Sequence, residues 1–314
     1  MPAMHVINTL LPVFAVIALG AYLQKTDFVS FEFVKGLNRL VYWVGLPCLL
    51  FYKVASAPYD FSRAGKTFVV VVIGILGCII IGYAVAFVIR IRPKAVGTFI
   101  QGAYRGNFFY VGLSVIIYSF SNSGEFDAAV METTAILVMA LVVPIHNIIA
   151  VVVLLASGHK IDRHVPGKIL RQVITNPLFV SCLAGVVYSV LLPQLPSVVV
   201  RTCTAVGQVS LPLALLSIGA TLVERRVAGR RASAFAAAII KIAAAPLIGL
   251  LAANLIGLGA GETRIALIFL ACPTAVVSYV MAEQLGGDEQ LAASIVVLTT
   301  LLSVLSLSLV VGLF

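Results

Sequence analysis

Residues 102–112 read GAYRGNFFYVG, at the centre of an apolar run, 94–120, that is long enough to cross a bilayer. Arg105 and Asn107, with Gly106 between them, fall near the middle of that run. Polar and charged residues at this depth are costly, and they usually face a protein interior or a watery cavity. The stretch therefore predicts a helix that is interrupted in mid-membrane and covered there by another part of the protein.

The composition is that of a membrane protein. Of the 314 residues, 61% are hydrophobic and 11% are charged, and the mean hydropathy is +1.12. Long apolar stretches recur along the whole chain, which predicts many crossings of the lipid bilayer and no soluble domain. The first stretch, 4–24, follows no Lys or Arg and is interpreted as a retained span rather than a signal peptide. The net charge of +9 lies in short loops, so it sets topology and indicates no nucleic-acid partner.

The sequence carries no motif of an enzyme or a metal protein. The five cysteines are scattered through apolar runs without a CxxC pair, which argues against a metal site or a disulfide framework. The segment GLGAGE, 257–262, lacks the Lys-Ser/Thr and the preceding strand of a phosphate-binding loop. Because no Ser-His-Asp set is evident either, we expect no enzymatic activity and no cofactor. The absence of an N-x-Ser/Thr sequence fits the inner membrane of a bacterium.

Apolar periodicity and helix breakers predict ten spans. Their approximate ranges are 4–24, 30–56, 66–90, 95–120, 126–156, 169–192, 196–223, 231–257, 262–285 and 289–313. The loops after odd-numbered spans hold fourteen basic residues, namely Lys25, Lys35, Arg39, Arg90, Arg92, Lys94, Lys160, Arg163, Lys168, Arg171, Arg225, Arg226, Arg230 and Arg231. The opposite side holds five, namely Lys53, Arg63, Lys66, Arg201 and Arg264. The positive-inside rule then predicts that both termini face outward.

A weak internal repeat recurs at an offset of 165 residues. Its anchors are Pro12 with Pro177, Leu46-Pro47 with Leu211-Pro212, Lys66 with Arg231, and Thr134 with Thr299. Each half holds five spans, an odd number, so the second half is inverted relative to the first. The predicted fold is an all-α membrane protein of ten transmembrane helices, with a first repeat at 1–156, a cytoplasmic loop at 157–168 and a second repeat at 169–314. Inverted repeats are typical of secondary transporters.

The same offset pairs Asn107 with Cys272, which precedes Pro273 in ACPTAVVSYVMAEQLGG. Both halves thus carry a helix breaker near mid-span, which predicts that helices 4 and 9 are broken and cross. Free amides at half-helix N-termini favour a carboxylate, and free carbonyls at C-termini favour a cation. The predicted substrate-binding residues are Arg105, Gly106, Asn107, Pro273 and Thr274. The alternative is that both breaks are kinks that serve packing.

Arg105 has its own alternative. Its charge contacts the substrate, extends toward the membrane surface, or pairs structurally, for example with Glu132 or Glu283.

These residues and several further segments resemble a known family. The closing run PTAVVSYVMAEQLGGDEQLAASIVVLTTLLSVLSL, together with GLPCLLFYKVA and NPLFVSCLAGVV, is similar to the auxin efflux carrier family, whose bacterial members include malonate transporter-like proteins. The resemblance covers essentially the whole chain. It implies ten helices in two inverted five-helix repeats, with crossing broken helices 4 and 9, and transport of organic anions without ATP. It also implies oligomers, chiefly homodimers. Asn107 and Pro273 match the family's two crossover residues.

The chain departs from the plant members of that family. Their helix 4 has an Asn-Pro-rich crossover, whereas Gly106 and Asn107 are followed here by two phenylalanines. Plant carriers also have a long cytoplasmic insert between helices 5 and 6, where this chain has a short loop. The resemblance therefore favours a small carboxylate over an indole-type substrate, and it implies no regulatory phosphorylation domain.

Three further residues are candidates for proton coupling. Glu132 lies in the outer part of span 5 and is either functional or a water-exposed vestibule residue. His146, beside Asn147, either bonds to a helix carbonyl or titrates near neutral pH. Lys241 in span 8 either pairs structurally or relays protons. The sequence leaves each pair of alternatives open.

Together these features predict a secondary active transporter that carries a small organic anion by alternating access. Protons or sodium would be the coupling ion. Two alternatives remain from other classes, a channel-like facilitator and a non-transporting membrane receptor on the same fold.

Overall fold

The computed structural model describes residues 2–56, 60–121, 126–157, 174–192, 194–224 and 231–313, together with Gly167 and Arg171. Within these ranges the regular structure is helical, and the extended pairing is limited to one bridge between Gly106 and Thr274. The prediction of an all-α protein is confirmed for these residues. Most of the predicted loop 157–168 lies outside the described residues, as do Lys160, Arg163, Lys168, Arg225, Arg226 and Arg230.

Six stretches of the described chain are long and apolar enough to cross a membrane. Four are single helices, namely α1 (Pro2–Lys25), α4 (Phe61–Val88), α7 (Ala128–Ser157) and α16 (Glu289–Leu313). Two are composite. They are α10 (Ser197–Gln208) with α11 (Ser210–Glu224), and α12 (Arg231–Ile239) with the π-helix η3 (Ile240–Ala244) and α13 (Ala245–Ile256). These lengths and compositions are those of a multi-pass membrane protein.

The remaining helices are shorter, and most of them adjoin a π-helix or a break. They are α2 (Phe31–Leu40), η1 (Val41–Gly45) and α3 (Leu46–Ser56), then α5 (Pro93–Tyr104), η2 (Phe108–Gly112) and α6 (Leu113–Ser121), then α9 (Pro177–Leu191), α14 (Ala260–Ala271) and α15 (Val277–Gln284). The two breaks, after Tyr104 and after Ala271, fall at the helix breakers that the sequence singles out. π-Helices are rare and often occur at functional sites.

Several helices begin where a side chain caps them. The Asp60 carboxylate accepts hydrogen bonds from the backbone N–H groups of Ser62 and Arg63 at the start of α4. The Asn176 side chain caps α9 in the same way, and Pro177 follows in its first turn, where a missing N–H costs nothing. These caps fix where the spans begin.

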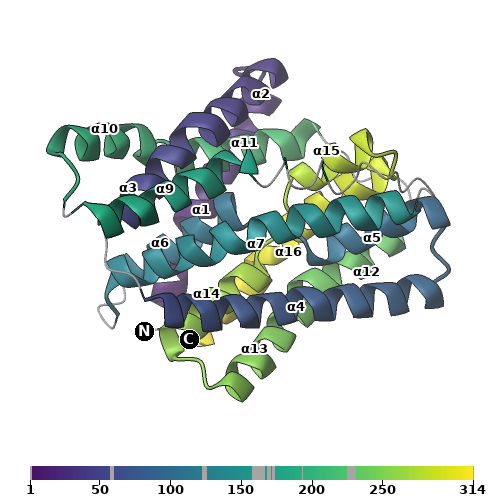
Figure 1. The fold of residues 1–314 in the computed structure, drawn as a ribbon. Coiled ribbons are helices and arrows are strands. Elements are labelled where there is room, and N and C mark those ends of the chain that lie inside the picture. The colour runs from purple at the N-terminus through teal and green to yellow at the C-terminus, as the bar shows by residue number, and fades with distance from the viewer. Residues whose placement is uncertain are drawn as a thin grey trace.

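The helices pack as two bodies (Figure 1). Body one contains α1, α2, η1, α3, α9, α10 and α11, and body two contains α4 to α7, η2, and α12 to α16 with η3. In body one, α1 packs closely on α11 because two glycines bring the backbones together. A Cβ added at Gly219 would lie 1.8 Å from the Ile17 carbonyl oxygen, and one at Gly20 would lie 2.1 Å from that of Leu216.

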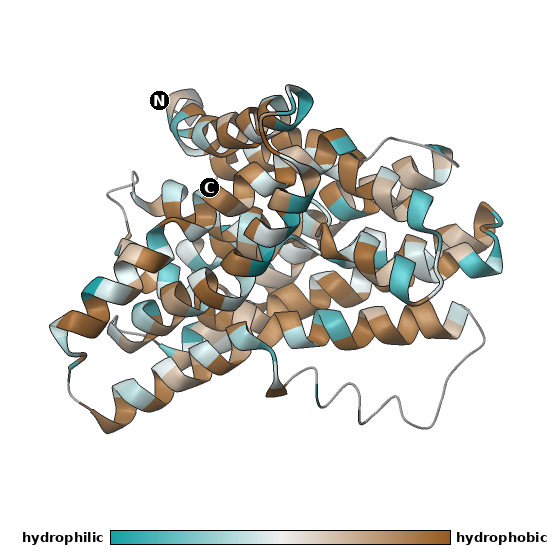
Figure 2. Ribbon diagram, turned by 90° about the horizontal axis from the view of Figure 1, so that it is seen from above, coloured by the Kyte–Doolittle hydropathy of each residue, from teal (hydrophilic) through white to brown (hydrophobic). Residues whose placement is uncertain are grey.

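The outer surface is apolar, as lipid contact requires. Figure 2 shows hydrophobic residues along most of the outer helices. Large exposed side chains include Phe87 and Val88 on α4 and Leu251 and Leu255 on α13. The two chain ends lie on the same side of the molecule (Figure 1), where a Cβ added at Gly312 would contact Val6. Such a continuous apolar surface suits a bilayer rather than water.

Candidate functional site

The two broken helices meet at their breaks. The helix α5 ends before Arg105, and α14 ends before Cys272. Between them, Asn107 N–H donates to the Pro273 carbonyl at 2.7 Å, and Ala275 N–H donates to the Arg105 carbonyl at 3.0 Å. This short antiparallel bridge satisfies backbone groups that the breaks leave open, which is what an irregular segment inside a membrane requires.

The two bridging hydrogen bonds are related by a local two-fold, as in any antiparallel bridge, which is centred here on Gly106 and Thr274. The two predicted helix breakers, Asn107 and Pro273, therefore lie side by side. The equivalence of Asn107 and Cys272 in an internal repeat stays a prediction.

Thr274 holds the crossing together from inside. Its hydroxyl donates to the Gly102 carbonyl at 2.7 Å, in the last turn of α5, and its N–H donates to the Thr299 hydroxyl at 3.0 Å. The crossing leaves no room for a side chain at Gly106, because an added Cβ would lie 2.2 Å from the Phe108 ring. Pro273 offers its carbonyl to Asn107. Two of the predicted substrate-binding residues, Pro273 and Thr274, thus shape the crossing.

A cavity of about 790 Å³ lies beside the crossing, between the two bodies. Polar side chains from body one that line it include Asn38, Arg39, Tyr42, Thr175, Asn176, Ser217 and Thr221. Body two contributes, among others, Arg105, Gly106, Asn107, Tyr110, His146, Asn147, Met281 and Gln284. Pro273 and Thr274 are not part of the lining. Two guanidinium groups, and no Asp or Glu among the described residues, line this cavity.

Arg105 is the buried cation of this cavity. It is 4% exposed, and its Nη2 donates to Asn147 Oδ1 at 2.5 Å. Its Nη1 lies 2.7 Å from Met281 Sδ, a weak acceptor. When the Gln101 amide oxygen is turned toward Arg105, it accepts from Nη1 at 3.3 Å, and the amide nitrogen then reaches the Ser278 carbonyl. All three partners are neutral, so the guanidinium charge is desolvated without a counter-charge.

The alternative of a structural ion pair for Arg105 is not found among the described residues. Glu132 forms an ion pair with Lys53, and Glu283 is exposed on α15. Within the described chain, Arg105 has no carboxylate at ion-pair distance. The alternative that Arg105 is held by Glu132 or Glu283 can therefore be set aside.

Asn107 faces the same cavity. Its carbonyl accepts from Val111 and Gly112 N–H, at the start of η2. Its side-chain amide makes no hydrogen bond to another described residue, so both its donor and its acceptor are available to a ligand.

The three candidates for proton coupling do not form one cluster. His146 lines the cavity, with its ring 4.9 Å from Phe108 and 5.5 Å from Tyr104, and its Nε2 has no hydrogen-bond partner among the described residues. Glu132 lies at another level of α7, paired with Lys53. Lys241 is fully buried and donates to the Leu270 carbonyl at 2.6 Å. Of the three, His146 alone is in reach of a ligand in the cavity.

Sequence reasoning missed the contribution of body one. Tyr42 on η1 and Ser217 and Thr221 on α11 line the cavity opposite Arg105. The spacing of Ser217 and Thr221, four residues apart in an apolar helix, places them on one face and was a usable signal. Tyr42 follows Asn38 at the same spacing. These polar faces were not recognised because neither helix carries a break.

The amino-acid sequence is similar to those of membrane transport proteins. A family described as "Membrane transport protein" matches residues 5–311. The chain belongs to this family of membrane transport proteins. A protein of Rhizobium meliloti (strain 1021), named "Putative malonate transporter", is 24% identical over 321 residues, which cover 96% of this chain and 93% of that protein. The resemblance to the auxin efflux carrier family is thereby confirmed, and so is the expectation of a transporter rather than an enzyme.

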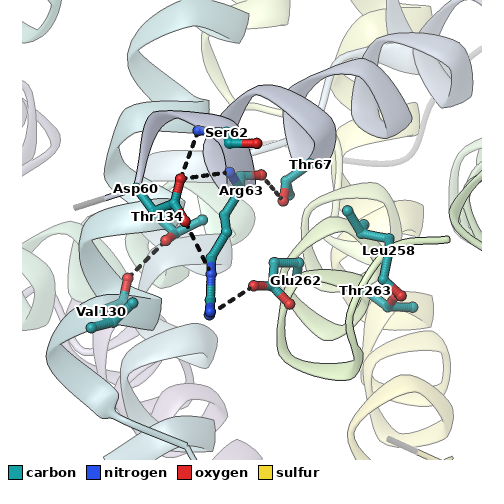
Figure 3. A network of polar contacts seen from close by, with 9 residues as sticks. All are labelled: Asp60, Ser62, Arg63, Thr67, Val130, Thr134, Leu258, Glu262 and Thr263. Carbon is teal, nitrogen blue, oxygen red and sulfur yellow. Dashed lines mark hydrogen bonds and ion pairs between the residues drawn. The ribbon is translucent and has the colours of Figure 1, made fainter. Parts of the chain in front are cut away.

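Ion pairs lie at the end of this transport protein where α3 stops and α4, α7 and α14 begin. Lys53 on α3 pairs with Glu132 on α7, which links body one to body two. Arg63 lies between Asp60 and Glu262, with a distance of 3.3 Å to each (Figure 3). The cavity reaches the other end, near Arg39 and Gln284.

Proposed function

We propose that this protein is a secondary active transporter for a small carboxylate, which binds in the cavity at Arg105. One observation carries the proposal. A guanidinium that is 4% exposed has neutral partners, in a cavity whose described lining contains no acidic residue. A buried charge without a counter-ion is strongly unfavourable, and an anionic ligand supplies what the protein omits.

The geometry of Arg105 suits a carboxylate. A guanidinium presents parallel N–H groups that match the two carboxylate oxygens. One of its nitrogens contacts Met281 Sδ, which a carboxylate oxygen would replace at a net gain. The free side-chain amide of Asn107 offers a second donor beside it. In this proposal Gly106 permits the close approach of backbone and ligand, while Pro273 and Thr274 act by holding the crossing.

The name of one relative suggests a substrate to test. The name of the Rhizobium meliloti protein points to malonate, a small dicarboxylate. Arg39, at the mouth of the same cavity, adds a second positive charge that favours an anion. Malonate is therefore the first compound to test.

We further propose that all ten spans predicted from the sequence cross the membrane, as two inverted five-helix repeats. The membrane would be a bacterial inner membrane, with both termini outside. The cavity then opens to the cytoplasm, since Arg39, at its mouth on α2, is one of the basic residues that the positive-inside rule assigns there. Alternating access would move body two against body one. The Lys53–Glu132 pair joins the two bodies at the outer end and would have to open in each cycle. Protons or sodium would couple the cycle, and a homodimer is the proposed assembly.

The test is uptake of radiolabelled malonate by proteoliposomes that contain the purified protein. A secondary transporter accelerates uptake when the vesicles are preloaded with unlabelled malonate, because exchange of bound substrate avoids the return of the empty site. A channel-like facilitator gives passive flux without this acceleration, and a receptor binds malonate without flux. Protein-free vesicles and vesicles with Arg105→Gln are the controls. Uptake equal to that of the Arg105→Gln vesicles would contradict the proposal.

A further inference from the structure

The second buried cation, Lys241, is placed where the broken helix α14 ends. Its side chain has no exposed area, and it projects from the π-helix η3. Its Nζ donates to the Leu270 carbonyl at 2.6 Å, one residue before α14 ends at Ala271. The described chain provides no carboxylate at ion-pair distance from it. The ammonium is thus compensated by backbone carbonyl, not by an acid.

The C-terminus of a half-helix in a membrane is a natural cation site. Its last carbonyls have no partner within the helix, and the helix dipole adds partial negative charge there. In transporters built on broken helices, such ends coordinate coupling ions. A protein that binds a coupling cation at this point would leave these carbonyls open to receive it.

In this protein, side chains and backbone of the chain itself occupy the end of α14. The Ile268 carbonyl accepts from Cys272 N–H at 3.0 Å, and the Phe269 carbonyl accepts from the Cys272 thiol at 3.0 Å. The Lys241 ammonium donates to the Leu270 carbonyl, and the Ser306 hydroxyl donates to the Ala271 carbonyl at 2.9 Å. The last four carbonyls are therefore all satisfied, and the one full positive charge among their partners is that of Lys241.

We propose that Lys241 is a tethered cation that takes the place of a mobile coupling cation at the end of α14, so that anion binding at the crossing does not need sodium. This inference rests on the proposed function, because it concerns the ion coupling of that same site. It also makes Lys241 a positioning residue. The Leu270 carbonyl that it holds lies two residues before Cys272, whose backbone leads into the bridge with Asn107 and Arg105.

A proton relay through Lys241 is the competing interpretation. Lys241 is absent from the cavity lining and fully buried, so in this conformation it does not face a proton donor in the cavity, as a relay requires. A fixed charge has no such requirement.

The first experiment uses the unmodified protein. Malonate affinity is measured by isothermal titration calorimetry in sodium chloride and in choline chloride at equal ionic strength. We expect the two dissociation constants to agree within about twofold. Binding that occurs in sodium and is lost in choline would overturn the inference and leave the proposed function intact. Absence of malonate binding in both salts would count against the proposed function itself.

The second experiment removes the tethered charge. In Lys241→Ala, the space and the carbonyls are open to a small cation, so its melting temperature should rise with sodium concentration and not with choline. Its malonate affinity should become at least about tenfold higher in sodium than in choline, since a bound ion must now supply the charge. Lys66→Ala, which removes an exposed lysine of α4, is the control and should show neither effect.

Equal melting curves of Lys241→Ala in the two salts would show that no cation replaces the ammonium, and the inference would be wrong. Lys241→Arg keeps a charge at this position and should stay sodium-independent even if the larger group lowers stability. If the alanine variant folds in neither salt, the comparison of salts in the unmodified protein decides.

Discussion

Arg63 and Arg105 are the same residue type in two opposite settings. Arg63 lies at the ion-paired end, where its side chain is 53% exposed and has two carboxylate partners, Asp60 and Glu262. Arg105 lies in the cavity, is 4% exposed and contacts an amide oxygen and a thioether sulfur. If stability alone mattered, the carboxylate partners would be at the buried Arg105 and not at the exposed Arg63, because a desolvated charge gains most from a counter-ion. Acidic side chains thus neutralise the arginine at the ion-paired end, whereas the arginine of the cavity has no counter-charge among the described residues.

The strongest way to break this contrast is to give Arg105 an acid. Met281→Glu would place a carboxylate against Nη1, in the position that we assign to the substrate. A charge-assisted hydrogen bond is worth about 1.5–3 kcal/mol, so malonate binding should weaken roughly 10- to 150-fold. The measurement is the dissociation constant by calorimetry.

Met281→Gln is the matched control for that variant. It has the same shape as glutamate without the charge, and it should weaken binding far less. If both variants lost malonate affinity to a similar extent, the shape of residue 281 and not its charge would govern binding. The absence of an acidic partner at Arg105 would then not explain malonate binding.

A smaller effect is expected at Asn107. Its side-chain amide faces the cavity without a partner among the described residues. One neutral hydrogen bond is worth about 0.5–1.5 kcal/mol, so Asn107→Ala should raise the malonate dissociation constant roughly 2- to 13-fold. Because no internal hydrogen bond is lost, the melting temperature should stay near that of the parent protein. A large drop in melting temperature with unchanged affinity would instead make Asn107 a structural residue.

The ion-paired end gives the next prediction. Glu132→Gln removes the acid that links Lys53 of body one to body two. A partly exposed pair contributes at most about 1 kcal/mol, so the balance between conformations should shift by roughly fivefold or less. The readout is the rate at which a single cysteine at Ser56 reacts with an impermeant maleimide in a cysteine-free background. Glu262→Gln, whose partner Arg63 lies in the same body, should leave that rate unchanged.

The smallest expected effect concerns Asp60. Backbone N–H groups of Arg63 and Ser62 donate to its carboxylate and hold its pKa below the ordinary value. A lowered pKa in the folded state stabilises the protein fully above the unfolded value of about 3.9, and this stabilisation is lost as the pH falls through the folded value. The melting temperature of the parent protein should therefore decline slightly more below about pH 4 than that of Asp60→Asn, which keeps the cap. An equal decline would show that Asp60 contributes nothing to acid stability.

Much of the site could be predicted from the sequence, because its signals are local. Arg105 and Asn107 stand out as polar residues at the centre of an apolar run, and Pro273 as a helix breaker. The structure brings these segments into contact through the Asn107–Pro273 hydrogen bond.

What could not be predicted depends on contacts between distant segments. The pairing of Lys53 with Glu132 joins residues from different helices, and apolar periodicity carries no information on such partners. Tyr42 and Ser217 enter the cavity from unbroken helices, so no breaker marked them.

If Arg105 binds the substrate carboxylate, a paired measurement on Arg105→Gln separates that role from a role in folding. Malonate affinity by calorimetry and melting temperature are recorded on the same purified samples, with Arg105→Lys alongside. We expect Arg105→Gln to lose affinity roughly 10- to 150-fold. Arg105→Lys should recover part of it, because an ammonium lacks the planar fork of the guanidinium. The melting temperature of Arg105→Gln should not fall, since a buried uncompensated charge is removed. An unchanged affinity together with a lower melting temperature would contradict a role in substrate binding, because Arg105 would then serve the fold and not the substrate.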